Sequence, residues 1–429
     1  MNSLKVLWHY WKTKSLTFAN RDQLQLYQQQ QISKFRHKIL SHSPYFKRFA
    51  DLPFDQWPLM NKEIMMRHFD EMNTAHLKLE TLLDCARKSE QSKDFSPKIG
   101  QYSVGLSSGT SGSRGLFVVS PREQQIWAGV MLAKMLPRGL LARERVALFL
   151  RADNHLYHSV DTRWLSLRFY GLFANFQQQL QQLQEFQPTI IIAPAQVLCV
   201  LAQEKQKGII RINPDLVISA AEVLDHHDRS QLEKVFTEVG EVYQATEGFL
   251  GSTCSHGVLH LNEEFIFVEP QWLDENRFVP IITDFTRETQ PVVRYRLDDI
   301  LVRRKEPCLC GRQGMAIARI EGRHDDQIML LNHLGQPLTI FSDYCSRIIA
   351  NHIPLNSDYR LIQKASGEFE LIACCALSDL QSCCLALEEH FLQQGANIED
   401  LKWILKPVES IPLSFMHKKR RIIHEKMIN

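Results

Sequence analysis

The sequence predicts an α/β fold in two parts: a large layered N-terminal domain over residues 1–324 and a small α+β C-terminal domain over residues 325–429. Three observations favour this division. From about residue 100, short apolar runs typical of buried parallel strands alternate with helical patterns. Residues 258–305 are richer in β-like segments, and a new mixture of strands and one helix begins after residue 326.

The expected elements follow in chain order. Residues 1–95 carry apolar positions at helical spacing, so the chain should begin with helices. Apolar runs predict parallel strands at residues 146–150, 189–193 and 216–219, with helices at residues 176–186 and 196–205. In the C-terminal part we expect strands at residues 359–363 and 369–373 and a helix at residues 380–394.

The composition is that of an ordinary globular protein, because 44% of the residues are hydrophobic and 23% are charged. The formal net charge of +2 gives no electrostatic argument for nucleic acid or an anionic membrane as a partner. The longest apolar stretch, residues 189–202, contains Pro194 and Gln196 and is shorter than the roughly 20 residues that a membrane span requires. The N-terminus is briefly amphipathic and has no signal-peptide pattern, so we expect a cytoplasmic protein.

A stretch rich in glycine and hydroxyl side chains follows the N-terminal helices. Glycines allow tight turns that expose successive backbone N–H groups, and the hydroxyls add donors for phosphate oxygens. It is not a Walker loop, because no Gly-Lys-Ser/Thr follows. A flexible linker is the alternative, but an apparent strand follows at once. We therefore predict a phosphate-binding loop made of Ser107, Ser108, Gly109, Thr110, Ser111, Gly112, Arg114 and Gly115.

Three cysteines and one histidine form a second candidate site. Cys254 and His260 are separated by five residues, and Cys308 and Cys310 lie in a polar Pro-Cys-Leu-Cys-Gly turn. Three thiols and one imidazole can bind zinc tetrahedrally, and four protein ligands leave no open position, so such a site would be structural. His256 is a competing ligand, and the spacing alone fits four unrelated side chains equally well.

The stretch Ser108-Gly-Thr-Ser-Gly112 resembles the signature of the adenylate-forming superfamily of acyl-CoA synthetases. Further motifs of that family follow in its order: Ser219-Ala-Ala-Glu222, Tyr243-Gln-Ala-Thr-Glu247, Tyr295-Arg-Leu-Asp-Asp299 and Glu321-Gly-Arg-His-Asp-Asp-Gln327. Residues 186–190 and the Pro-Cys-Leu-Cys-Gly turn are similar to the branch of phenylacetate–CoA ligases and of synthetases that adenylylate a deazaflavin coenzyme. The resemblance covers residues 100–425 and implies a mobile C-terminal lid joined near Asp325.

The resemblance also implies a role for each motif. Glu247 would ligate magnesium on the ATP phosphates, because a carboxylate suits a hard cation. Asp299, or its neighbour Asp298, would accept both ribose hydroxyls, and Arg323 would donate to ribose or phosphate. The other nucleotide-contacting residues would be Ala220, Ala221, Glu222, Tyr243 and Thr246, with Thr110 also taking part in catalysis. The alternative for each charged residue is an ordinary surface position.

Near the C-terminus, residues 411–421 resemble the family segment that carries a catalytic lysine. The alignment places this lysine at Lys418, where its ammonium would offset charge that develops on the carboxylate and the α-phosphate during adenylation. A basic tail acting only through solubility or nucleic-acid binding is the alternative. Three positions that are glycine in the family carry other residues here, namely Gln244, Asp298 and His417.

The resemblance predicts ATP-dependent adenylation of a carboxylic acid, expected to be an aryl acid, followed by acyl transfer to coenzyme A or to a carrier-protein thiol. The cofactors would be ATP, magnesium, coenzyme A and a structural zinc. Transfer of AMP to a hydroxyl, and a catalytically inactive nucleotide-binding protein, are the alternatives. The acid pocket could use His155, His158, Phe169, Tyr170 and Phe173, although the aromatic residues suit a core equally well.

Overall fold

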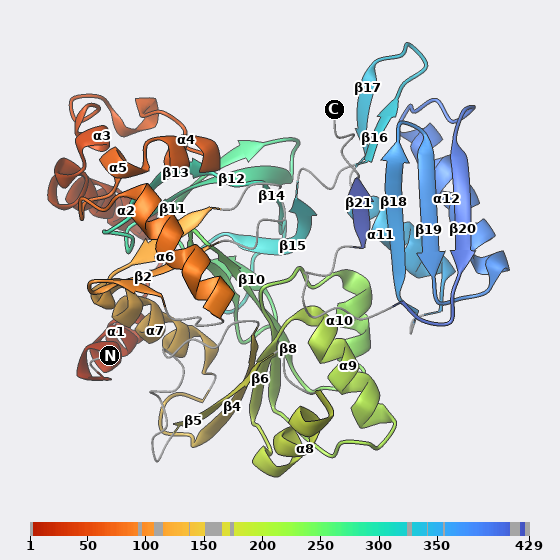
Figure 1. The fold of residues 1–429 in the computed structure, drawn as a ribbon, viewed down its shortest axis with the longest axis horizontal. Coiled ribbons are helices and arrows are strands. Elements are labelled where there is room, and N and C mark those ends of the chain that lie inside the picture. Colours follow the sequence, from red (N-terminus) through yellow and green to blue (C-terminus); the bar gives the residue numbers. More distant parts are fainter. Residues whose placement is uncertain are drawn as a thin grey trace.

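The computed structural model describes residues 3–92, 97–106, 115–136, 138–150, 165–171, 176–323, 328–340, 342–354, 357–411 and 421–424. Its core is a mixed sheet with helices on both faces, and a separate C-terminal sheet lies beside it (Figure 1). The predicted fold class is therefore confirmed. The predicted boundary between residues 324 and 325 falls outside the described residues.

The chain begins with helical segments. Those within residues 21–72 share one apolar cluster with strands of the antiparallel half of the main sheet. Side-chain caps fix several helix starts; Asn20, for example, accepts a hydrogen bond from the N–H of Gln23 and begins α2. The segments are α1 (Ser3–Ser15), α2 (Arg21–Lys38), η1 (Leu40–His42), α3 (Pro44–Lys47), η2 (Phe54–Gln56), α4 (Lys62–Arg67), α5 (Phe69–Met72) and α6 (Leu79–Ser92). No helix in the described part of the chain is both long and apolar enough to cross a membrane.

A small antiparallel sheet holds the ends of the glycine-rich stretch. It consists of β1 (Lys98–Ile99), β2 (Tyr102–Leu106) and β3 (Leu116–Val119). Leu106 and Leu116 are paired across β2 and β3, so the two ends of the stretch are held opposite each other. Residues 107–114 themselves lie outside the described residues.

The parallel half of the main sheet has the strand order β5-β4-β6-β7-β8. The strands predicted at residues 146–150, 189–193 and 216–219 are confirmed as parallel neighbours. Alternate strand residues face opposite layers: Ala147 and Val217 pack toward α8–α10, and Val146 and Ile218 toward α7. The strands are β4 (Glu144–Leu150), β5 (Leu165–Gly171), β6 (Ile190–Ala193), β7 (Leu216–Ser219) and β8 (Val239–Ala245), and the helices are α7 (Pro121–Met135), α8 (Phe176–Phe186), α9 (Ala195–Gln206) and α10 (His226–Leu232).

The antiparallel half continues the same sheet from β8 in the order β9-β10-β15-β14-β12-β11, with β13 paired to β12. It matches the β-rich texture expected for residues 258–305. Its strands are β9 (Gly248–Thr253), β10 (Leu259–Leu261), β11 (Ile266–Trp272), β12 (Arg277–Asp284), β13 (Val292–Arg296), β14 (Asp299–Arg303) and β15 (Ala316–Arg323).

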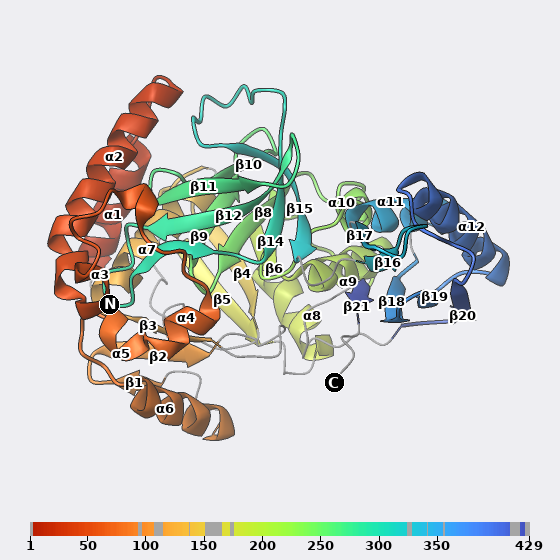
Figure 2. The same ribbon diagram turned by 90° about the horizontal axis from the view of Figure 1, so that it is seen from above.

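The C-terminal part has a four-stranded sheet in the order β20-β19-β18-β21 and a hairpin, β16 to β17. Its apolar cluster draws only on residues from Ile328 onward, so it is a core of its own. Figures 1 and 2 both place it at the end of the molecule opposite α1. The elements are β16 (Ile328–Leu331), β17 (Pro337–Ile340), α11 (Ser342–His352), β18 (Tyr359–Ala365), β19 (Glu368–Ala373), α12 (Leu377–Gln393), β20 (Lys402–Pro407) and β21 (Ile422–His424).

Candidate active site and cysteine–histidine cluster

The candidate site lies at the carboxyl edge of the parallel strands. The chain runs from β4 to β5 on one side and then returns to β6 on the other, so the strand order reverses beside β4. Open α/β sheets bind ligands outside the carboxyl ends of their strands at such a reversal. The segments that leave this edge after β7 and β8 are residues 220–222 and 246–247, and both contain predicted nucleotide contacts.

The segment after β7 has an unusual backbone. The N–H of Ala220 donates to the carbonyl of Ala193 at 3.0 Å, which ties the segment to the end of β6. Ala221 then adopts a φ of +66°, a left-handed conformation that costs a residue with a Cβ about 1–3 kcal/mol. The carboxylate of Glu222 accepts a hydrogen bond from Gln196 Nε2 at 2.8 Å. Strain held in place this way is typical of backbone that is shaped for a ligand.

Tyr243 and Asp299 are brought together from distant parts of the chain. The Tyr243 hydroxyl donates to Asp299 Oδ2 at 2.7 Å, which fixes one oxygen of a carboxylate at the start of β14. Asp299 is also the register partner of Arg323 on β15, so the backbones of the two proposed ribose contacts are adjacent. The Arg323 side chain lies outside the description.

Glu247 occupies the turn between β8 and β9, where Ala245 and Gly248 are paired. Burial raises the pKa of its carboxyl, a hydrogen bond with the Tyr295 hydroxyl opposes this shift, and the nearby charge of Asp299 adds to it. Glu247 keeps some solvent exposure, and carboxylate oxygens close to one another are ligands that suit a hard divalent cation. The oxygen donors present therefore fit magnesium.

Sequence reasoning missed the residues that support this turn. Arg287 Nη1 donates to the Thr246 carbonyl at 3.2 Å. The Asp284 carboxylate lies against the backbone of Gly248, where an added Cβ would meet Oδ2 at 2.4 Å, so a larger residue would force this carboxylate to move. Burial raises the pKa of Asp284 to about 6. None of these contacts joins residues close in sequence. No local sequence pattern could therefore have indicated them.

Several predicted site residues fall outside the described residues. They are the phosphate-loop positions Ser107, Ser108, Gly109, Thr110, Ser111, Gly112 and Arg114, the hinge residue Asp325, the candidate acid-pocket residues His155, His158 and Phe173, and Lys418 with His417. Gly115 is described, immediately before β3. Of the remaining pocket candidates, Tyr170 is buried in the core, where its ring stacks on Phe149 with centroids 4.7 Å apart.

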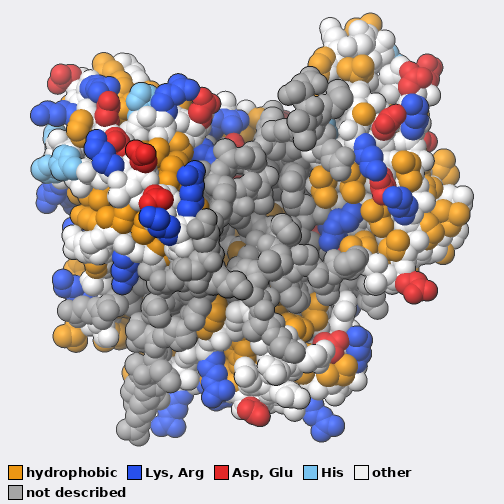
Figure 3. All heavy atoms as spheres, in the orientation of Figure 1, with side chains coloured by type: hydrophobic (Ala, Val, Ile, Leu, Met, Phe, Trp, Pro, Cys, Tyr) orange, Lys and Arg blue, Asp and Glu red, His pale blue; other side chains and the backbone are white. Residues whose placement is uncertain are grey.

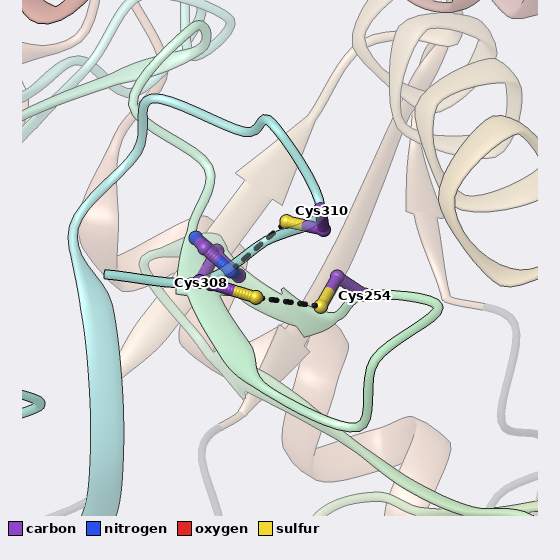
Figure 4. Close-up of side chains that lie close together, drawn as sticks. Cys254, Cys308 and Cys310 are labelled. Carbon is purple, nitrogen blue, oxygen red and sulfur yellow. Dashed lines mark hydrogen bonds between the residues drawn. The ribbon is translucent and has the colours of Figure 1, made fainter. Parts of the chain in front are cut away.

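The four predicted metal ligands lie together at the other end of β9. One potential ligand atom from each of Cys254, His260, Cys308 and Cys310 lies within 4.8 Å of all the others. Figure 4 shows the three cysteine side chains pointing toward one another. The Cys254 and Cys308 sulfurs are 3.6 Å apart, and Cys310 Sγ is 3.4 Å from His260 Nε2. These separations are close to those between ligands bound tetrahedrally at ~2.0–2.3 Å.

The surroundings of this cysteine–histidine cluster also suit zinc. His260 Nδ1 contacts the Gly314 carbonyl at 2.9 Å, which makes this nitrogen the donor and leaves the Nε2 lone pair facing the thiols. Burial lowers the pKa of His260, which favours the neutral ring that a metal requires. Backbone N–H groups of His256 and Arg312 donate to the sulfurs of Cys254 and Cys310, each at 3.4 Å. His256 thus contributes its backbone here, and its ring lies near Ser255.

Arg421 joins the C-terminal sheet to helix α10. Its guanidinium pairs with Asp225 and with Asp228 at 2.8 Å, both from α10 and its cap, and with Asp358 at 3.3 Å from the C-terminal part. It also lies over the Tyr359 ring, 4.9 Å from the centroid. Burial alone would lower the pKa of Arg421, but these neighbours raise it well above its ordinary value. Arg421 is only 7% exposed, so this Arg421 cluster is a buried ionic contact between the two parts of the protein.

No protein-family model and no curated protein sequence matches the chain. Solved structures do match. A 2-hydroxyisobutyryl-CoA ligase in the postadenylation state, in complex with 2-HIB-AMP, is 15% identical over 94% of this chain and 89% of its own, with a TM-score of 0.65. The chain has the fold of this acyl-CoA ligase. ATP-bound MatB from Rhodopseudomonas palustris matches 73% of this chain and 65% of its own, at 12% identity and a TM-score of 0.51.

The arrangement of the two parts can be compared as well. The same 2-hydroxyisobutyryl-CoA ligase in the thioesterification state, with 2-HIB-AMP and CoA, gives a TM-score of 0.52 at 16% identity. The chain therefore superposes better on the postadenylation state than on the thioesterification state.

Proposed function

We propose that this chain is an ATP-dependent adenylate-forming ligase that converts a carboxylic acid to its acyl-AMP and then transfers the acyl group to coenzyme A. The observation that carries the proposal is the cluster of Glu247, Tyr243 and Asp299 at the carboxyl edge of the parallel strands. Tyr243 and Glu247 come from one motif and Asp299 from another, and they meet where this fold would place ATP. The similarity to acyl-CoA ligase structures supports the same reaction class.

The residues take distinct roles in this proposal. Asp299, held by Tyr243, accepts the ribose hydroxyls, with Arg323 beside it on β15. The strained segment Ala220, Ala221 and Glu222 lies against adenine. Glu247 would hold magnesium, which supplies positive charge to the phosphates of bound ATP. The loop 107–115 surrounds those phosphates, Thr110 included, and Lys418 neutralises charge at the reacting α-phosphate.

We further propose an aryl acid as the substrate and membership of the phenylacetate–CoA ligase branch. The Pro-Cys-Leu-Cys-Gly turn and its cluster support the branch. The test is pyrophosphate release across a panel of aryl and aliphatic acids, with and without coenzyme A. Release with an aryl acid and formation of the thioester support the proposal. A stable AMP ester of a hydroxyl compound, or no release with any acid, would contradict it.

The phosphate loop gives the first testable prediction. The double variant Thr110→Ala, Arg114→Ala removes one hydroxyl donor and one cation from the proposed phosphate site. Charge-assisted hydrogen bonds contribute about 1.5–3 kcal/mol, so we expect ATP affinity to fall by at least about tenfold in calorimetry. Arg48→Ala, which removes an exposed ion pair with Glu71, is the control and should leave affinity unchanged. Equal ATP affinity in the double variant and the native protein would exclude the loop.

The second prediction concerns zinc, which we propose as the resident metal of the cysteine–histidine cluster. Protein purified without chelators should contain about one zinc per chain, as expected for a closed four-ligand site. Cys308→Ser should lose most of the metal and lower the midpoint of thermal unfolding. Cys85→Ser, at a cysteine remote from the cluster, should change neither quantity. Folded native protein that contains no zinc, or Cys308→Ser with full metal content, would show that the ligand set is wrong.

A further inference from the structure

Helix α1 already has one apolar face that the fold uses. Val6 and Tyr10 are buried, and Gly129 of α7 approaches so closely that an added Cβ would lie 2.7 Å from the Val6 carbonyl oxygen. Thr13 is buried on the same face, at the spacing of successive helical turns. This contact accounts for the attachment of α1 to the main body of the protein.

A second apolar face of α1 points to solvent. Leu4, Leu7, Trp8 and Trp11 recur at the i, i+3, i+4, i+7 spacing of a helical stripe, and they are 76%, 39%, 58% and 60% exposed. We call these four residues the α1 stripe. Two exposed tryptophans beside two exposed leucines on one helix are more than scattered surface apolar residues, and such patches mark interaction sites.

The Lys, Asp and Glu content of α1 gives the helix charges of one sign. Residues 3–15 contain no Asp or Glu, whereas Lys5 and Lys12 are exposed one heptad apart on the same flank. The Lys12 ammonium lies over the Trp8 ring, 5.1 Å from its centroid, so cation and indole are presented together. The whole-chain charge of +2 conceals this local excess. On the face shown in Figure 3, acidic and basic side chains are interspersed.

We propose that the α1 stripe docks this protein on an anionic lipid surface. The helix would lie in the plane of the interface, with Leu7, Trp8 and Trp11 among the headgroups and acyl boundary, and with Lys5 and Lys12 against lipid anions. Interfacial helices combine tryptophan and leucine on one side with flanking lysines, and indole rings favour the headgroup level. A protein partner would more often be matched by charges of both signs, which α1 lacks.

The position of α1 suits such docking. It lies at the end of the molecule opposite the C-terminal sheet in both ribbon views (Figures 1 and 2). A protein bound through the α1 stripe would therefore keep the C-terminal part away from the lipid. A single helix of 13 residues, with one face already committed to α7, provides reversible association rather than permanent anchoring.

The test is co-sedimentation with vesicles of phosphatidylcholine alone and of phosphatidylcholine mixed with phosphatidylserine. We expect the native protein to bind the mixed vesicles and to be released by salt. Trp8→Ala with Trp11→Ala, and separately Lys5→Glu with Lys12→Glu, should each weaken binding by at least about 10- to 30-fold. Trp272→Ala, at a tryptophan 42% exposed on β11, is the matched control and should bind like the native protein.

Three outcomes would overturn the proposal. The first is native protein that stays in the supernatant with mixed vesicles at low salt. The second is equal binding to both vesicle types. The third is a native oligomer that dissociates in the tryptophan variant while vesicle binding is unchanged, because the α1 stripe would then contact a second copy. Unaltered thermal midpoints establish that the variants are folded, and the lysine variant tests the surface without changing its apolar residues.

Discussion

Lys418→Ala should abolish most acyl-AMP formation and leave thioester formation from synthetic acyl-AMP largely intact. In the proposed adenylation pose, the Lys418 ammonium stabilises negative charge that builds in the transition state and leaves with pyrophosphate. Removing one such donor costs about 100- to 1,000-fold in rate, or about 3–4 kcal/mol. The proposal places thioester formation in a different orientation of the C-terminal part, so we expect this step not to depend on the Lys418 contact. Pyrophosphate release and thioester formation, assayed separately, measure the two steps.

Lys419→Ala is the matched control, because it removes the same charge one residue away, and we expect a mild effect. A basic tail that acts only by long-range attraction would weaken both half-reactions modestly, and added salt would mimic the substitution. Equal losses in both half-reactions, or none in either, would remove Lys418 from the mechanism. Either result would also show that the alignment of this segment with the family, across His417, is wrong.

Arg421→Ala should release the C-terminal part from helix α10. The substitution removes the Arg421 guanidinium from Asp228, which is only 2% exposed. Loss of one partner of a buried ion pair typically costs about 3–5 kcal/mol. If amide hydrogen exchange in α10 and β18 requires the C-terminal part to separate from α10, we expect this exchange to accelerate by more than about 100-fold. Arg421→Lys should be intermediate, since it keeps the charge and loses the forked contacts.

Arg360→Ala is the control for this experiment. Arg360 pairs with Asp358 at 3.1 Å within the C-terminal part and makes no ion pair to α10 in the described structure. Its removal should leave exchange in α10 unchanged. If Arg421→Ala leaves protection in α10 and β18 at native values, the Arg421 cluster does not hold the two parts together.

The fold was largely predictable because its signals are local. The apolar runs of β4, β6 and β7 stand out from their neighbours, and parallel strands buried on both faces must be apolar along their length. The cysteine–histidine cluster was also predictable, since residue chemistry alone selects Cys254, His260, Cys308 and Cys310. The fold then brings β9, β10 and the 308–310 turn together.

The missed contacts depend on topology instead of local pattern. Arg421 lies 196 and 193 residues after Asp225 and Asp228, and nothing in a run of basic residues indicates which one is buried. The hydrogen bond from Tyr243 to Asp299 joins two predicted site residues, yet their direct contact follows only from how β8 and β14 are placed in the sheet. For α1, the sequence showed apolar periodicity but not which of its two faces packs on α7.

The ionic character of the contact at Arg421 affects how readily the protein would aggregate if its two parts separate. The C-terminal apolar core is built from residues 328 onward, and Arg421 contacts α10 through carboxylates. Separation at this contact exposes charged groups that water hydrates readily. The separated form should therefore resist aggregation at concentrations where an exposed apolar interface would cause it. Because Arg421 and Asp228 are buried, we expect added salt to weaken this contact less than it would weaken an exposed ion pair.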